Sequence, residues 1–141
     1  MSAKKKQPRA PAQKRILLVD AHPLLRRGLT ALIETEPDLV VCAEAATHQA
    51  GLAAIAIAKP DLVIADLSLA DSDGLELIKD IKARFPRLPV LALSMHEEAI
   101  YAERALRAGA RGYVSKQELD ATLLVAIRRV LAGEIHTSEA R

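Results

Sequence analysis

The stretch LVIAD, residues 62–66, consists of four apolar residues followed directly by an acid. A run this short and apolar throughout is typical of a strand that is buried on both faces of a parallel sheet. An aspartate at the end of such a strand is costly to bury unless a cation or hydrogen bonds compensate for its charge. The stretch therefore predicts a central strand whose carboxyl end carries a functional acid, Asp66.

Three further polar residues follow short apolar runs in the same way: Asp20, Ser94 and Lys116. In an open α/β sheet, residues at the carboxyl ends of the strands line the crevice in which ligands bind. We therefore expect two carboxylates, a hydroxyl and an ammonium to face one another at one edge of the sheet.

The segments between these runs have the apolar spacing of amphipathic helices. We expect helices from His22-Pro23 to Pro37, from Thr47 through Ala58, from Asp73 to Phe85, from about Glu97 to Ala108 and from Leu119 to Gly133, with a further strand over 39–43. Strand and helix alternate five times, which predicts a single doubly wound α/β domain, (βα)5. The fourth helix, with Ile100, Ala105 and Leu106 among many alanines, is expected to pack most weakly and to be the moving part.

Charge is distributed unevenly along the chain. Six of the 20 basic residues and none of the 18 acidic ones fall within 1–15, so the remainder carries a net charge near −4. Residues 1–14 have no apolar face to bury, so we expect a disordered basic arm before a folded domain over 15–133. Such an arm can touch nucleic acid or anionic surfaces nonspecifically, but we favour a solubilising leader or a cloning artefact.

Composition excludes several functions. Aromatic residues make up only 2% of the 141 residues, which argues against recognition of nucleic acid by base stacking. The single cysteine, Cys42, cannot form an internal disulfide, so it suits a reducing cytoplasm and is interpreted as a small core residue. No apolar stretch approaches the roughly 18 residues of a membrane span. We expect a cytoplasmic protein that does not associate with membranes.

Four segments, residues 16–23, 66–74, 93–96 and 108–116, together cover nearly the whole folded region. In this order and spacing they resemble the receiver domains of two-component response regulators, and among them the NarL/LuxR-type transcription factors. The resemblance implies a flavodoxin-like fold with strand order 2-1-3-4-5. It also implies a signalling domain that accepts a phosphoryl group from a sensor histidine kinase and is not an enzyme beyond its own phosphorylation and dephosphorylation.

The resemblance implies a role for each site residue. Asp66 would be the phosphoacceptor, with Ser94 and Lys116 binding the phosphoryl oxygens. Ser94 and Tyr113 would form the switch that controls dimerisation or a DNA-binding output. Mg²⁺ would be held by Asp20, Asp66 and the backbone carbonyl of Ser68, because attack on a phosphohistidine crowds negative charge that cations must offset. Ser68 and His96 would tune the loss of the acyl phosphate.

The chain departs from the family pattern after the first strand. Most active receivers have a second acid directly after the first, usually the one that touches the metal, whereas here Ala21 follows Asp20. We therefore expect Mg²⁺ to bind more weakly, by roughly one or two orders of magnitude. Two other departures, Leu69-Ala70 for Met-Pro and Gln117 for the proline of many receivers, look tolerable for the fold.

Two hypotheses remain open. The residues Asp66, Ser94 and Lys116 favour a phosphorylation switch, while Ala21 favours a phosphorylation-independent interaction module. Taken singly, Ser94 could cap a helix and Lys116 could be a solvated charge. A flavin-binding or small-molecule enzyme shares this architecture, but no phosphate-cradling glycine loop follows the first strand.

The remaining expectations concern the histidines and the end of the chain. His22 and His96 are not spaced like a metal-binding pair and are interpreted as surface residues. Residues 134–141 resemble the start of the linker that precedes a helix-turn-helix effector. Without a recognition helix, this chain should not bind DNA specifically, and we expect a histidine kinase and possibly a second copy of the chain as its partners.

Overall fold

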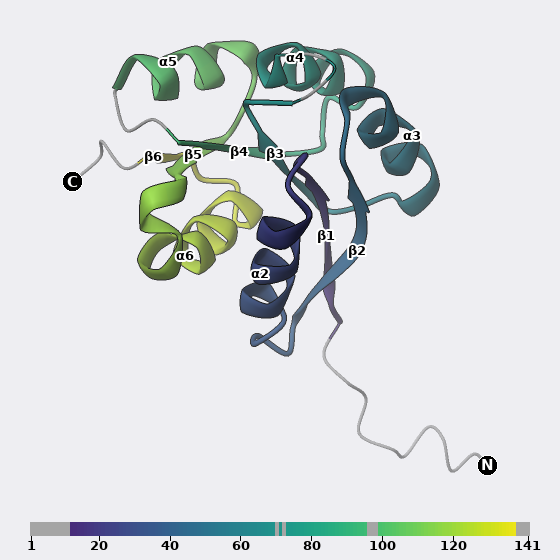
Figure 1. Cartoon of the computed structure of the whole chain (residues 1–141), viewed down its shortest axis with the longest axis vertical. Coiled ribbons are helices and arrows are strands. Elements are labelled where there is room, and N and C mark those ends of the chain that lie inside the picture. The colour runs from purple at the N-terminus through teal and green to yellow at the C-terminus, as the bar shows by residue number, and fades with distance from the viewer. Residues whose placement is uncertain (1–11, 70, 72, 96–98, 138–141) are drawn as a thin grey trace.

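The computed structural model describes residues 12–69, 71, 73–95 and 99–137. Within these residues the chain alternates between strands and helices (Figure 1). The strands are β1 Lys14–Val19, β2 Leu39–Ala45, β3 Leu62–Asp66, β4 Val90–Ser94, β5 Gly112–Ser115 and β6 His136–Thr137. The helices are α2 Pro23–Ile33, α3 His48–Ala58, α4 Gly74–Arg84, α5 Ala99–Ala108 and α6 Leu119–Leu131, with a 3₁₀ turn η1 at Lys116–Glu118.

The strands form one parallel sheet in the order β2-β1-β3-β4-β5-β6. The predicted order 2-1-3-4-5 is therefore confirmed, and a sixth strand that the sequence analysis did not expect extends the sheet beyond β5. In this strand the backbone N–H of His136 donates to the carbonyl of Arg111 at 3.0 Å. Two residues are too few for a hydrophobic period, so this part of the presumed linker gave no sign of a strand.

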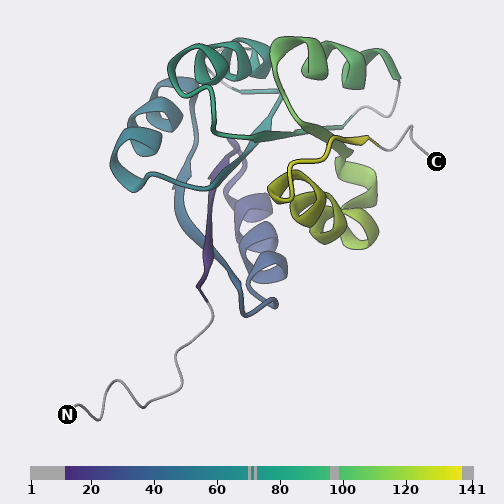
Figure 2. The ribbon, with the colours of Figure 1, turned by 180° about the vertical axis from the view of Figure 1, so that it is seen from behind.

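Helices cover both faces of the sheet. Figures 1 and 2 show α3, α4 and α5 on one face and α2 and α6 on the other. Successive strand residues alternate between the two cores: Leu17 and Val19 pack with the first group of helices, Ile16 and Leu18 with the second. Burial on both faces explains why β3, β4 and the last four residues of β1 have almost uninterrupted apolar sequences.

The predicted helices are all present, and the side chains of Thr47 and Asp73 cap two of them. The Thr47 side chain accepts from the N–H of Ala50 at 3.1 Å, and Asp73 accepts from the N–H of Leu75 at 2.8 Å. One core prediction was wrong, because Ile100 is 50% exposed. The buried face of α5 is made of alanines instead, at Ala102, Ala105 and Ala108.

Those alanines each bury little apolar area, which agrees with the expectation that α5 packs weakly. In α6 the buried residues are Leu123, Ala126, Ile127 and Val130, and Leu124 packs partly against the second core. Cys42 is only partly buried on β2 rather than a full core residue.

The start of the domain differs slightly from the prediction. The basic arm was expected to run through residue 14, but β1 begins at Lys14, whose N–H donates to the carbonyl of Asp38 at 2.9 Å. Residues 1–11 of the arm, and 138–141 of the expected linker, lie outside the described residues. None of the helices described is long and apolar enough to cross a membrane.

Candidate functional site

The sheet brings the predicted site residues to one edge. Asp66 is the last residue of β3, Ser94 is the last residue of β4, and Asp20 and Lys116 come directly after β1 and β5. The register pairs Asp66 with Leu93, the residue before Ser94. Asp20 and Asp66 are each 1% exposed and Ser94 is 2% exposed. Because each of these residues lies at or just after the end of an apolar strand, the parallel sheet places their buried polar side chains at the same edge, as expected from the sequence.

Lys116 joins the two carboxylates. Its Nζ lies 3.1 Å from Asp20 Oδ2 and 3.1 Å from Asp66 Oδ2, and its side chain is only 7% exposed. The residue is thus a buried counter-ion shared by two acids, and the alternative of a solvated charge at the strand end is wrong. Without this ammonium, two like charges would face each other in a region of low dielectric.

The outer oxygens of the two carboxylates are held by backbone groups. Asp66 Oδ1 accepts from the N–H of Ser68 at 3.1 Å, and Asp20 Oδ1 accepts from the N–H of His22 at 2.8 Å. The Oδ2 atoms of both acids are buried and accept no hydrogen bond from any residue in the described part of the chain, although Lys116 lies close. Buried carboxylate oxygens in this state suit a divalent cation, so the donor set fits the predicted metal.

The environment of Asp66 disfavours its charge. Burial raises the pKa of its carboxyl above the ordinary value, and the nearby Asp20 acts in the same direction. The hydrogen bond from the Ser68 N–H and the ammonium of Lys116 oppose this rise in the pKa. A metal cation would add to that opposition, because it stabilises the ionised form.

His22 is a site residue that the sequence analysis missed. It is exposed, as expected of a surface residue, with 62% of its side chain accessible. Its Nδ1 nevertheless lies 2.8 Å from Asp20 Oδ1 and 3.8 Å from Asp66 Oδ2. One ligand atom from each of these three residues lies within 4.8 Å of the others. The two-residue spacing from Asp20 was the available clue, since the turn after β1 brings the ring back over the acid.

The loop after β3 depends on Gly74. An ideal Cβ at this position would collide with the carbonyl oxygen of Asp66, whereas the glycine lets α4 begin directly beside the acid. The N–H of Gly74 donates to the carbonyl of Leu67 at 3.0 Å, and Ser68 forms a bridge with Asp73. Ser68, the third predicted metal ligand, is therefore fixed next to Asp66 in an exposed turn.

Other predicted residues lie at or beyond the margin of the cluster. Tyr113 is 1% exposed and belongs to the same buried core as Ala102 and Ala105 of α5. Gln117, which replaces a common proline, donates from Nε2 to the carbonyl of Met95 at 3.1 Å and so links the loops after β4 and β5. His96 and Ala70 lie outside the described residues.

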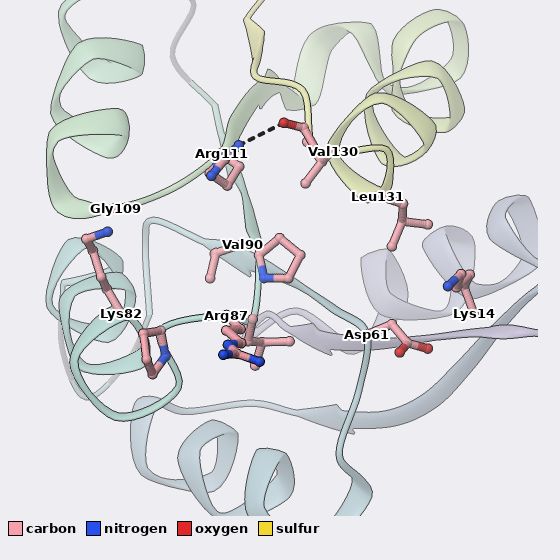
Figure 3. Close-up of a pocket in the computed structure, with 13 residues that line it drawn as sticks. Lys14, Asp61, Lys82, Arg87, Val90, Gly109, Arg111, Val130 and Leu131 are labelled. Atoms are coloured by element: carbon pink, nitrogen blue, oxygen red, sulfur yellow. Dashed lines mark hydrogen bonds between the residues drawn. The ribbon is translucent and has the colours of Figure 1, made fainter.

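A separate cavity lies at the opposite end of the sheet. Its volume is about 310 Å³, and it opens beside the residues that precede β1, β3, β4 and β5 or begin them. Figure 3 shows Lys14, Lys82, Arg87 and Arg111 around it, with the Arg111 guanidinium donating to the carbonyl of Gly133 at 2.8 Å. Ligands of open α/β sheets bind at the carboxyl ends of strands, so we place the functional site at the acidic cluster.

Comparison with known proteins identifies the family of the chain. The family of the response regulator receiver domain matches residues 16–128. The nitrate/nitrite response regulator NarL of Escherichia coli K12 is 38% identical over 127 residues, which are 89% of this chain and 58% of NarL. The transcriptional activator ExaE of Pseudomonas putida is 38% identical over 88% of this chain and 58% of its own length. The chain thus spans somewhat more than half the length of these curated relatives.

Solved structures give the same result. The LuxR-family two-component response regulator of Aurantimonas sp. SI85-9A1 superposes with a TM-score of 0.86 at 37% identity, covering 90% of this chain and 91% of that one. A second match is the isolated receiver domain of RcsB from Salmonella enterica serovar Typhimurium, determined in the presence of the phosphomimetic BeF₃⁻. It superposes with a TM-score of 0.82 at 26% identity, covering 90% of this chain and 94% of that one. With the fold, the acidic cluster and the family match in agreement, this chain belongs to the response regulator receiver domains of the NarL/LuxR type.

Proposed function

We propose that Asp66 accepts a phosphoryl group from the phosphohistidine of a sensor kinase and that the resulting change at the ends of β4 and β5 controls a partner. The observation that carries this proposal is the Lys116 ammonium, 3.1 Å from the Oδ2 atoms of both Asp66 and Asp20 in a buried cluster. Such an arrangement keeps a nucleophilic carboxylate next to a cation that can also bind the incoming phosphoryl oxygens.

The chemistry requires Asp66 to be ionised. A carboxylate oxygen forms a bond to phosphorus while the bond from phosphorus to the kinase imidazole breaks, and the freed electron pair stays with that imidazole. Asp66 Oδ1 accepts from the N–H of Ser68 at 3.1 Å and Oδ2 lies 3.1 Å from Lys116 Nζ, so the carboxylate is held in a fixed orientation for the attack. Burial raises the pKa of Asp66, so Lys116 and this hydrogen bond are needed to keep the charged form available.

Asp20, Asp66 and the backbone carbonyl of Ser68 would hold Mg²⁺. When bound, the ion supplies positive charge that offsets the charge of the carboxylates and the phosphoryl oxygens. The chain provides only two carboxylates for it, since Ala21 has no donor atom. The Mg²⁺ affinity should therefore be lower than in receivers with a second acid at that position.

Phosphorylation of Asp66 would change the loops at the ends of the neighbouring strands β4 and β5. New phosphoryl oxygens can accept from the hydroxyl of Ser94 and pair with Lys116, which draws the loops after β4 and β5 inward. The Gln117 to Met95 hydrogen bond couples these loops, so both should move together. The buried side chains described for α5 are those of Ala102, Ala105 and Ala108, and Tyr113 packs in the same core, so this region can rearrange at low cost. Phosphorylation then shifts an existing equilibrium.

The partners follow from the same proposal. A histidine kinase would supply the phosphoryl group in the cytoplasm, and the altered surface would control dimerisation or the DNA-binding output that longer relatives carry. This piece alone is not expected to bind DNA specifically.

A second candidate is a phosphorylation-independent interaction module. Ala21 favours it, because the missing carboxylate weakens the Mg²⁺ site. In this case a protein or a small ligand, not a kinase, would set the state of the domain.

Intact-protein mass spectrometry after incubation with acetyl phosphate separates the two candidates. The reaction is run with and without Mg²⁺, with Asp66→Asn as the control. An adduct that requires both Mg²⁺ and Asp66 supports the phosphorylation switch. No adduct at high Mg²⁺, together with an adduct in the Ala21→Asp variant, would overturn it in favour of the second candidate.

A further inference from the structure

The third donor of the acidic cluster is an imidazole and not a carboxylate. Ala21 contributes no ligand atom, and the next residue, His22, places Nδ1 2.8 Å from Asp20 Oδ1 and 3.8 Å from Asp66 Oδ2. Ligand atoms bound to one ion at about 2.0–2.2 Å are themselves roughly 3–3.5 Å apart. The observed spacings of the imidazole from the two carboxylates bracket that range, so a single ion can bind all three groups after small side-chain movements.

The groups around this position are incompletely satisfied. Asp20 Oδ2 and Asp66 Oδ2 are buried and accept no hydrogen bond from any residue that the structure describes. Lys116 is near both at 3.1 Å, but its charge compensates only one of the two acids. The two carboxylates and the one ammonium together have a formal charge of −1, which attracts a divalent cation. The long stem of Lys116 lets the ammonium withdraw when an ion enters.

The donor types discriminate between metals. Mg²⁺ demands oxygen ligands in near-ideal octahedral geometry and dehydrates reluctantly, so an imidazole adds little to its binding. Imidazole is a good ligand for Zn²⁺ and other later first-row ions, and affinity for a site with N and O donors rises from Mn²⁺ through Co²⁺ towards Cu²⁺. Exchanging a carboxylate for an imidazole thus lowers Mg²⁺ affinity and raises the relative affinity for these ions.

We propose that this pocket binds a first-row transition-metal ion such as Co²⁺ or Zn²⁺ in preference to Mg²⁺, with His22 Nδ1 and the carboxylates of Asp20 and Asp66 as its ligands. The contact between His22 Nδ1 and Asp20 Oδ1 holds the imidazole beside the cluster, and the side chain is 62% exposed. Nδ1 donates to the Asp20 carboxylate in this contact, so an ion binds the other tautomer, in which solvent has returned the ring proton to Nε2 and the Nδ1 lone pair is free for the metal. The inference rests on the proposed function only in assigning this pocket as the phosphoacceptor site.

Metal binding is tested without any phosphoryl donor. The full chain, prepared without a histidine tag, is titrated with Co²⁺ and with Mg²⁺ by calorimetry, and the visible absorption of bound Co²⁺ is recorded. We expect Co²⁺ to bind at least about tenfold more tightly than Mg²⁺. His22→Ala should lower the Co²⁺ affinity by at least about tenfold, while the Mg²⁺ affinity stays about the same. Ala21→Asp should raise the Mg²⁺ affinity and so reduce the ratio of the Co²⁺ affinity to the Mg²⁺ affinity.

Two controls locate the ion. Asp66→Asn should weaken Co²⁺ binding, whereas His48→Gln should not, because His48 is buried elsewhere and its Nε2 contacts Asp80 at 2.7 Å. In the unaltered chain, long-range ¹H–¹⁵N spectra with Zn²⁺ should shift Nδ1 of His22, which avoids any dependence on how well a variant folds. Equal Co²⁺ and Mg²⁺ affinities, an unchanged ratio in His22→Ala, or a Zn²⁺ shift at another histidine would overturn the proposal.

The phosphorylation assay remains separate from this one. A transition-metal preference without any acetyl phosphate adduct, with either ion, would refute the proposed function but support the metal assignment. An adduct in a chain that prefers Mg²⁺ would support the proposed function and refute the metal assignment.

Discussion

Replacing Lys116 with methionine should destabilise the domain strongly at neutral pH. Methionine keeps much of the length and volume of lysine but removes the ammonium that lies 3.1 Å from Asp20 Oδ2 and 3.1 Å from Asp66 Oδ2. Both acids are 1% exposed, so water cannot take over the role of the ammonium. The variant would leave two carboxylates close together with no cation to compensate them.

The magnitude follows from the burial of the pair. Removing one partner of a buried ion pair costs about 3–5 kcal/mol, because the remaining charge is uncompensated. The loss is limited here because Asp66 can take up a proton, and burial already raises its pKa. We therefore expect a loss of about 3 kcal/mol at neutral pH in metal-free buffer. The deficit should shrink as the pH falls through the raised pKa of Asp66, since a protonated acid no longer needs the ammonium.

Urea unfolding in the presence of a chelator measures the free energy at neutral and at mildly acidic pH. Lys79→Met is the matched control, because Lys79 pairs with Glu76 at 3.3 Å on the exposed surface of α4 and should cost less than about 1 kcal/mol. A Lys116→Met variant as stable as this control at neutral pH would refute the reasoning. So would a deficit that does not change with pH.

Three further predictions concern other parts of the domain. Asp66→Asn should stabilise the metal-free chain at pH values above the ordinary pKa of aspartate, because the raised pKa of Asp66 makes its ionisation unfavourable to folding. In urea unfolding the variant should be more stable than the unaltered chain at neutral pH and should lose this advantage at acidic pH; equal midpoints of the two proteins at both pH values would contradict this. Gly74→Ala should cost about 2 kcal/mol in urea unfolding, because its Cβ would meet the carbonyl oxygen of Asp66, whereas Gly28→Ala, with open space around it on α2, should stabilise by about 0.5–1 kcal/mol; a Gly74 variant of unchanged stability would argue against the close approach. Burial lowers the pKa of His136 below its ordinary 6.5, so the stability that β6 gains from the neutral imidazole is complete above that pH and is lost as the pH falls towards the folded-state value; NMR of the β6 amides should show release on acidification, and unchanged shifts would contradict it.

The fold was predictable because β3, β4 and the last four residues of β1 are buried on both faces. The runs that end at Asp20, Asp66 and Ser94 are apolar throughout, so their lengths and ends could be identified without a structure. The two-residue β6 could not be found in this way, since its docking depends on a backbone hydrogen bond to Arg111 and not on a pattern. The buried face of α5 was misjudged at Ile100 because alanines can fill a close helix-to-sheet contact where a larger residue cannot.

The clustering of the two acids and the lysine was predictable, but its geometry was not. Strand ends identified Asp20, Asp66 and Lys116, yet the sequence could not show that one ammonium bridges both acids. His22 was missed because its relevance depends on the turn after β1, which folds an exposed ring back over Asp20. Pair contacts of this kind depend on loop conformation, which residue type and spacing do not determine.

The central claim is that Asp66 takes up a phosphoryl group. It is tested most directly by treating the chain with acetyl phosphate and a divalent metal, reducing the product with borohydride and sequencing the peptides by mass spectrometry. Borohydride converts an aspartyl phosphate to homoserine. The account predicts homoserine at position 66 and an unmodified Asp20. Homoserine at any other acid, or at none with either Mg²⁺ or Co²⁺ present, would contradict it.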